Sequence, residues 1–182
     1  MTFFRSVLLI LLMSFTAMGQ QNSPREASSP RQVPVSCPVT TPPAVPFTPP
    51  TPYERSEGGR TFLLGTEKLW TVMMTSGVWG WGPHKPGHEQ DVQPLTTKTF
   101  WASTDFDYRN EYPPKLTVTG RRLDGPTQPL LTLTPTNAFP GPTAAMLVGV
   151  YVPAPGCWEI TGEYRNEKLS FVVWVTPLNS TQ

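Results

Sequence analysis

Short apolar runs ended by proline or glycine fill the chain from about Gly59 to Pro177 and leave little room for a helix. The 182 residues include 23 prolines and 14 glycines. Proline disrupts helix interiors, and no window shows a sustained helical period ahead of a cap. Such runs are typical of an all-β sandwich or barrel. The strands that we expect are Thr61–Leu64, Lys68–Met73, Gly77–Trp81, Thr99–Ser103, Lys115–Thr119, Leu130–Thr134, Ala144–Val152, Cys157–Tyr164 and Lys168–Thr176.

The clearest strand pair is a hairpin of Pro155–Tyr164 and Leu169–Val175 around a short polar turn. Side chains alternate between the two faces of a strand. The face that we expect toward the core carries Trp158, Ile160, Gly162, Tyr164, Leu169, Phe171, Val173 and Val175. Cys157 then points away from the core, on the side of Val172 and Trp174, which need cover from another segment.

Residues 1–19 have the three parts of a secretory signal: the basic Arg5, the apolar run Val7–Met13, and small residues ahead of Gln20. We predict cleavage before Gln20, and an uncleaved anchor is the alternative. The apolar run is too short for a bilayer of roughly 30 Å, which needs about 20 apolar residues. We therefore expect a secreted or periplasmic protein without a transmembrane segment after cleavage.

The chain has two cysteines, Cys37 and Cys157. In an oxidising compartment two cysteines most simply form one bridge, and two free thiols are the alternative. A bridge between them closes a loop on the order of 120 residues. The chain-entropy model gives such a loop roughly 4 to 5 kcal/mol of stabilisation.

Changes in composition divide the chain into four parts. A signal peptide (1–19) precedes a proline-rich extended arm (20–56), which resembles a polyproline spacer. The β-sandwich domain (57–178) follows, with a short tail (179–182). Cys37 lies within the arm, so we expect a bridge to tie the middle of the arm to the outside of the sandwich.

Four pieces of the sequence carry a resemblance: Cys37–Thr40, Lys68–Thr71, Lys115–Asp124 and Pro155–Gly162. They resemble an uncharacterised family of exported bacterial proteins with an immunoglobulin-like β-sandwich. The resemblance implies an immunoglobulin-like antiparallel sandwich outside the cytoplasm. It implies no catalytic residue, because the family has no assigned activity.

The two histidines, His84 and His88, lie in a segment rich in glycine and proline. With Glu89 and Asp91 they offer two nitrogen and two oxygen ligands to zinc or copper. Histidines four apart share a helix face, but Pro86 and the following glycine exclude a helix here. A solvated loop is therefore favoured, and a metal site is the alternative.

The densest acidic cluster contains Asp105, Asp107 and Glu111. Paired carboxylates can hydrolyse sugars or bind calcium, and on a strand the two aspartates would project to one side. The segment does not follow the twelve-residue calcium pattern. We favour an exposed turn or edge.

Other chemistry is disfavoured by the sequence. No serine lies in a Gly-x-Ser-x-Gly elbow and no glycine-rich phosphate loop is present, so we expect neither an enzyme nor a cofactor. Removing Arg5 with the leader leaves 13 basic and 13 acidic residues. The only basic block is Arg121-Arg122, so a nucleic-acid partner is not expected.

Aromatic side chains are the remaining functional hint. The residues that we assign to a candidate binding surface are Trp79, Trp81, Trp101 and Trp174. Phe100 and Trp101 are adjacent, so they cannot both face one core. Outward rings can be covered by docking of arm residues 38–53, or can serve as a platform for sugars or a partner peptide.

These observations predict a non-enzymatic, exported binding or structural module of the cell envelope whose partner and oligomeric state are unknown. A metal-binding protein that uses the histidine segment is the alternative. A carbohydrate-active enzyme based on the acidic cluster is a third hypothesis.

Overall fold

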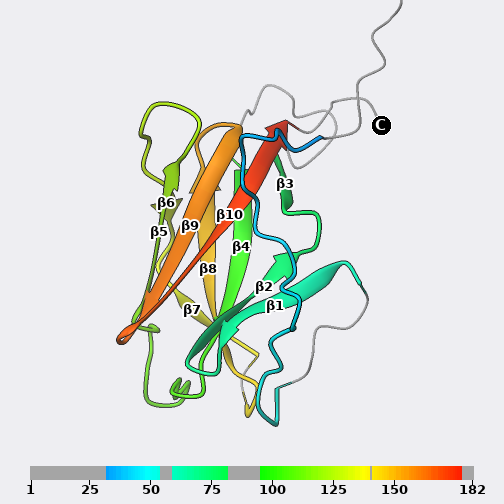
Figure 1. Ribbon diagram of the computed structural model, residues 1–182. Helices are drawn as coiled ribbons and strands as arrows, with labels where there is room; N and C mark the ends of the chain where they lie inside the picture. The colour runs from blue at the N-terminus through cyan, green and yellow to red at the C-terminus, as the bar shows by residue number, and fades with distance from the viewer. Residues whose placement is uncertain (1–31, 54–58, 82–94, 140, 178–182) are drawn as a thin grey trace, which may run out of the picture. The chain divides into compact units, whose positions relative to one another are not determined.

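The computed structural model describes residues 32–53, 59–81, 95–139 and 141–177, and these residues form two β-sheets that pack together (Figure 1). The strands are β1 (Thr61–Thr66), β2 (Leu69–Met74), β3 (Val78–Trp81), β4 (Leu95–Ala102), β5 (Leu116–Arg122), β6 (Leu131–Thr132), β7 (Thr136–Ala138), β8 (Ala145–Val152), β9 (Gly156–Tyr164) and β10 (Glu167–Pro177). Within these ranges there is no helix, and hence none suited to crossing a membrane. The predicted all-β sandwich is confirmed.

The strands pair in two sheets. Sheet A has the order β1-β2-β4-β8-β6, with β7 also paired to β8, and sheet B has the order β3-β10-β9-β5. Neighbours are antiparallel except β3 and β10, which run parallel. The predicted hairpin is β9 and β10, with Gly162 opposite Leu169 in its register. Its turn begins at Arg165, which has a φ of 55°.

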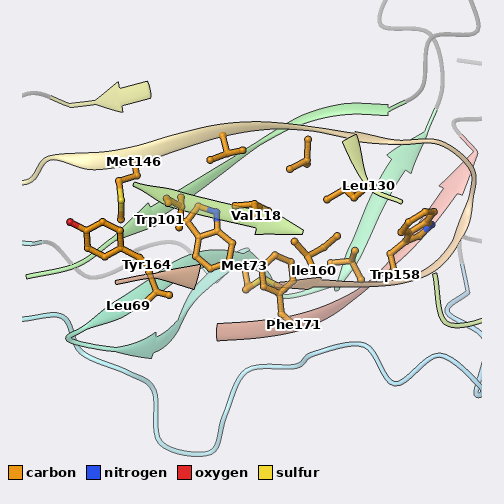
Figure 2. Packing of buried hydrophobic residues seen from close by; sticks show 14 of the residues in the cluster. Leu69, Met73, Trp101, Val118, Leu130, Met146, Trp158, Ile160, Tyr164 and Phe171 are labelled. Atoms are coloured by element: carbon orange, nitrogen blue, oxygen red, sulfur yellow. The ribbon is translucent and has the colours of Figure 1, made fainter. Parts of the chain in front are cut away.

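The core lies between the sheets and follows the predicted alternation. Ile160 of β9 and Val173 of β10 are fully buried, and Trp101 of β4 reaches them from sheet A. Figure 2 shows Trp101 among Ile160, Phe171 and other buried side chains, and its ring centroid is 5.9 Å from that of Phe171. The Trp101 indole N–H donates to Thr99 Oγ1 at 3.0 Å, so its polar atom is satisfied inside the core.

Gly162 lies on the inward face of β9, and only a glycine fits there because the Trp101 ring occupies the space beside it. A Cβ atom at Gly162 would be 2.4 Å from Cζ3 of the indole ring. Since both partners are parts of packed strands, neither can move freely. The missing side chain at one position therefore makes room for one of the two indole rings that are fully buried in the core.

A disulfide joins Cys37 to Cys157, with 5.6 Å between the Cα atoms, and the described residues contain no free cysteine. Both cysteines are buried, although Cys157 lies on the outer side of β9, because the arm covers it. The predicted bridge is thus confirmed. A structural disulfide of this kind indicates an oxidising, non-cytoplasmic compartment.

The described part of the arm, residues 32–53, packs on the outside of the sandwich. Next to the bridge, the Thr40 N–H donates to Val172 O at 2.9 Å, and the Val172 N–H donates to Thr40 Oγ1 at 2.9 Å. Val39 packs at Gly77, where a Cβ atom would be 3.0 Å from the valine. The arm therefore pairs with the backbone of Val172, and Figure 1 shows it in blue passing β10 toward β2 and β1.

The structure adds one strand that the sequence did not predict, and it places the acidic segment in turns, the arrangement that the sequence favoured. β7 was not predicted, because Thr136–Ala138 is short and becomes a strand only through pairing with β8. Asp105 and Asp107 do not lie on a strand. The Asp105 N–H donates to Ser103 Oγ and the Arg109 N–H donates to Asp107 Oδ1, so side chains of the segment stabilise turns instead.

Candidate binding groove on the outer face of sheet A

A groove lies on the outer face of sheet A, where β2 and β4 meet the arm and the segment before β8. Outward positions of the strands form its floor, including Trp70 and Val72 of β2 and Phe100 of β4. Tyr53 of the arm lines it, as does Phe139, beyond β7. Its volume is about 510 Å³. The described residues that line it are Tyr53, Leu63, Trp70, Thr71, Val72, Phe100, Trp101, Ala102, Phe139, Thr143 and Ala145, and none of these is charged.

The arm fills the neighbouring part of this face. The rings of Phe47 and Tyr53 lie 5.7 and 4.8 Å from the Trp70 ring, measured between centroids. Together with Leu63 and Ala102 they form a second apolar cluster, separate from the core. Trp70 is only 4% exposed as a result. Burial also raises the pKa of the Tyr53 phenol, whose hydroxyl donates to Ser103 O at 3.4 Å.

Phe139 presents an unusually exposed aromatic ring at the groove. Its ring stacks on that of Phe100 with 5.7 Å between centroids and an interplanar angle of 25°, yet 62% of the residue is exposed. Its backbone has a φ of 52°, in the left-handed region that bulky residues rarely adopt. The exposed ring therefore extends the apolar lining of the groove into solvent.

The aromatic residues predicted to form a binding surface are not gathered in one place. Trp101 is fully buried, so its assignment to an exposed platform is wrong: its position in β4 faces the core while Phe100 faces outward. Trp79 packs against the core, 6.1 Å from the Phe171 ring. Trp174 is half-buried on β10, and Trp81 lies in β3 with its side chain outside the description.

The groove could not be found by inspecting tryptophans alone. Phe139 and Tyr53 come from segments without a strand pattern, and only the folded arrangement brings them beside β2 and β4. The available signal was the adjacent pair Phe100 and Trp101, which requires one ring to face outward. Docking of the arm was expected, and it occurs on Trp70, a ring that the sequence had not singled out.

The predicted metal ligands His84, His88, Glu89 and Asp91 lie outside the described residues. Among the residues that are described, no group of three or more His, Cys, Asp or Glu side chains is placed to hold a metal ion. The metal hypothesis therefore stays a prediction.

The acidic cluster is divided among different partners. Asp105 pairs with Lys68 at 3.1 Å, and Asp107 accepts from the Asn110 amide at 2.7 Å. The hydrogen bond from the Asn110 side chain and the one from the Arg109 N–H lower the pKa of Asp107. Glu111 instead accepts the Tyr164 hydroxyl at 2.9 Å. These contacts fix turns at one end of the sandwich.

The Tyr164 hydroxyl links β9 to the loop before β5. Glu111 also accepts the Lys115 N–H at 2.8 Å, and Arg165 Nη2 lies 3.8 Å from its other oxygen. Burial raises the pKa of Tyr164 to about 12, opposed by the bond to Arg165 and reinforced by Glu111. The hydroxyl is thus a stable donor at neutral pH.

The sheets, the buried bridge and the groove define a β-sandwich protein strapped by its own N-terminal arm. No family model, curated protein or solved structure matches the chain. The resemblance to exported bacterial sandwich proteins therefore remains a prediction, and the groove is interpreted from the chain's own residues.

Proposed function

We propose that the protein is an exported, non-enzymatic binding module of the cell envelope, secreted or periplasmic, that holds apolar groups in the groove of sheet A. The observation that carries the proposal is the exposed Phe139 ring stacked on Phe100 over an uncharged floor. An apolar concave surface with aromatic walls is the usual form of a binding site. The separate engagement of Asp105, Asp107 and Glu111 supports a role without acid-base chemistry.

An apolar fluorophore tests whether the groove binds. Anilinonaphthalene sulfonate, titrated into the folded protein, is expected to give a saturable rise in fluorescence. Phe139→Asn should remove most of that rise, because asparagine tolerates the left-handed backbone but lacks the ring. Leu131→Asn is the matched control, since Leu131 is 61% exposed and does not line the groove. Equal signals from both variants would refute a groove site.

Native mass spectrometry of protein recovered from its cells tests export. The expected mass is that of a chain that begins at Gln20, and it is two hydrogens lower than the mass of the same chain after reduction. An intact leader would contradict the predicted cleavage and favour an uncleaved anchor. Added mass of a metal ion, lost when His84 and His88 are replaced, would favour the metal-binding alternative instead.

A further inference from the structure

The groove continues a surface that the chain's own arm already covers. Phe47 and Tyr53 belong to an arm segment that contains three prolines, and both rings pack on Trp70. Tyr53 lines the groove as well, so the occupied and open parts of this face share one ring. The occupied part shows which chemistry the face accepts: an extended, proline-containing segment with aromatic side chains.

The open part has the same character. Val72 and Phe139 expose apolar side chains there, and the described residues that line it are all uncharged. Proline-rich segments bind to aromatic-lined grooves because their backbone is already extended and loses little entropy on binding. An uncharged groove gives no reason to select an acidic or basic peptide.

Sugars fit this groove less well. A sugar ring needs aromatic stacking and also several hydrogen-bond partners. Three described residues with hydroxyl groups line the groove, Tyr53, Thr71 and Thr143. The Thr71 hydroxyl already donates to Phe100 O at 2.7 Å, and the Tyr53 hydroxyl donates to Ser103 O. The stacking surface is present, but two of the three hydroxyls are engaged within the protein.

A second copy of the chain is also a poor occupant. The arm of each copy is tied to its own sandwich by the buried bridge and by the bonds between Thr40 and Val172. Its Phe47 and Tyr53 rings are already packed. These contacts favour a segment of another polypeptide over the arm of a second copy as the occupant.

We propose that the groove binds an extended, proline-containing segment of a partner protein through one aromatic side chain inserted beside Phe100 and Phe139. This inference rests on the proposed function and specifies its ligand. The arm of the protein acts as the permanent neighbour of that segment, with Tyr53 as the shared wall.

A peptide with the sequence of Ala44–Tyr53, labelled with fluorescein, provides the probe. We expect saturable binding to the intact, oxidised protein, measured by fluorescence anisotropy. Phe139→Asn should weaken binding about tenfold or more, as expected for an aromatic anchor. Phe100→Thr, which preserves a residue suited to strands, should weaken it as well. Leu131→Asn should leave it unchanged.

The contrary outcomes separate the inference from the proposed function. Absence of saturable peptide binding while the fluorophore still binds would overturn the peptide inference but leave an apolar site. A peptide with alanine in place of Phe47 and Tyr53 that binds equally well would also overturn it. Binding of a soluble β-linked oligosaccharide that depends on Phe139, without peptide binding, would assign the groove to sugars and overturn it too.

Discussion

Trp101 and Gly162 show at the residue scale how one pair of positions fixes the distance between the sheets. The indole ring enters the space above Gly162 and packs against Phe171, so it joins a strand of sheet A to both strands of the hairpin. Alternation alone places Gly162 on the inward face, but not the ring that fills its space. That information comes only from the packing of sheet A on sheet B.

Gly162→Ala should destabilise the protein by about 1–3 kcal/mol, because the added methyl group overlaps the buried Trp101 ring. Urea unfolding followed by circular dichroism measures this loss. Gly149→Ala is the matched control in a strand. There the new Cβ meets Cδ1 of Leu133, a flexible and half-exposed side chain, so the change should be within about 0.5 kcal/mol. Equal losses for both variants would contradict this packing account.

Tyr164 contributes stability that the protein loses at high pH. Its pKa of about 12 in the folded state exceeds the ordinary value of 10.0. A raised pKa means that the stabilisation is complete below pH 10 and is lost as pH rises through 12. By pH 11 the loss should be about 1 kcal/mol.

The measurement compares unfolding free energies at pH 9 and pH 11 for the protein and for Tyr164→Phe. The variant is less stable at both values, because Glu111 loses its hydroxyl donor. The difference between the two pH values, however, should be smaller in the variant. An unchanged difference would show that another group titrates.

The strands were predictable from the sequence as elements because their residue types and alternation agree with their tertiary environment. β8, β9 and β10 were predicted to within a residue or so at each end. β4 begins at Leu95, four residues before its predicted start, because pairing with β8 extends it through threonines and a lysine that carry little apolar signal. β7 depends on that same partner.

Much less of the groove could be predicted. The docking of an arm near Cys37 followed from the cysteines and from the need to cover Val172. The role of Phe139 did not, since nothing in its local sequence indicates a ring stacked on Phe100. Contacts between segments without secondary structure depend on the assembled fold and have no local sequence pattern.

The bridge fastens the arm to β9, and its removal should affect both elements. The double variant Cys37→Ser, Cys157→Ser is expected to lose about 2–5 kcal/mol of stability. Denaturant unfolding in oxidising buffer measures the loss, with the wild type under reducing conditions as a second reference. Hydrogen exchange should also become faster at the Val172 amide, which Thr40 protects. Unchanged exchange would show that the arm docks without the bridge.

At the scale of the whole molecule, the arm contacts the outer faces of both sheets. Thr40 and Val39 lie on sheet B at β10 and next to β3, whereas Phe47 and Tyr53 lie on sheet A. The disulfide holds only the first of these contacts. The second depends on aromatic packing against Trp70.

Replacing Phe47 and Tyr53 by alanine should uncover Trp70 without unfolding the sandwich, because the core cluster does not contain these rings. Acrylamide quenching of tryptophan fluorescence should increase. The same replacements in a Trp70→Phe background should give no increase, which assigns the signal to that ring. Val45→Ala, in an exposed part of the arm, is the control. No change in quenching would mean that Trp70 keeps its cover by other means.

The disulfide also makes the chain between residues 37 and 157 a covalent ring of 120 residue steps. One proteolytic cut anywhere inside that ring leaves both pieces attached to each other, and they separate only after reduction. A cut at the turn between β9 and β10 lies outside the ring and frees β10 from every covalent tie to the rest of the molecule. A non-reducing gel therefore distinguishes the two kinds of damage, and the hairpin turn is the place where a single nick can release a central strand of sheet B.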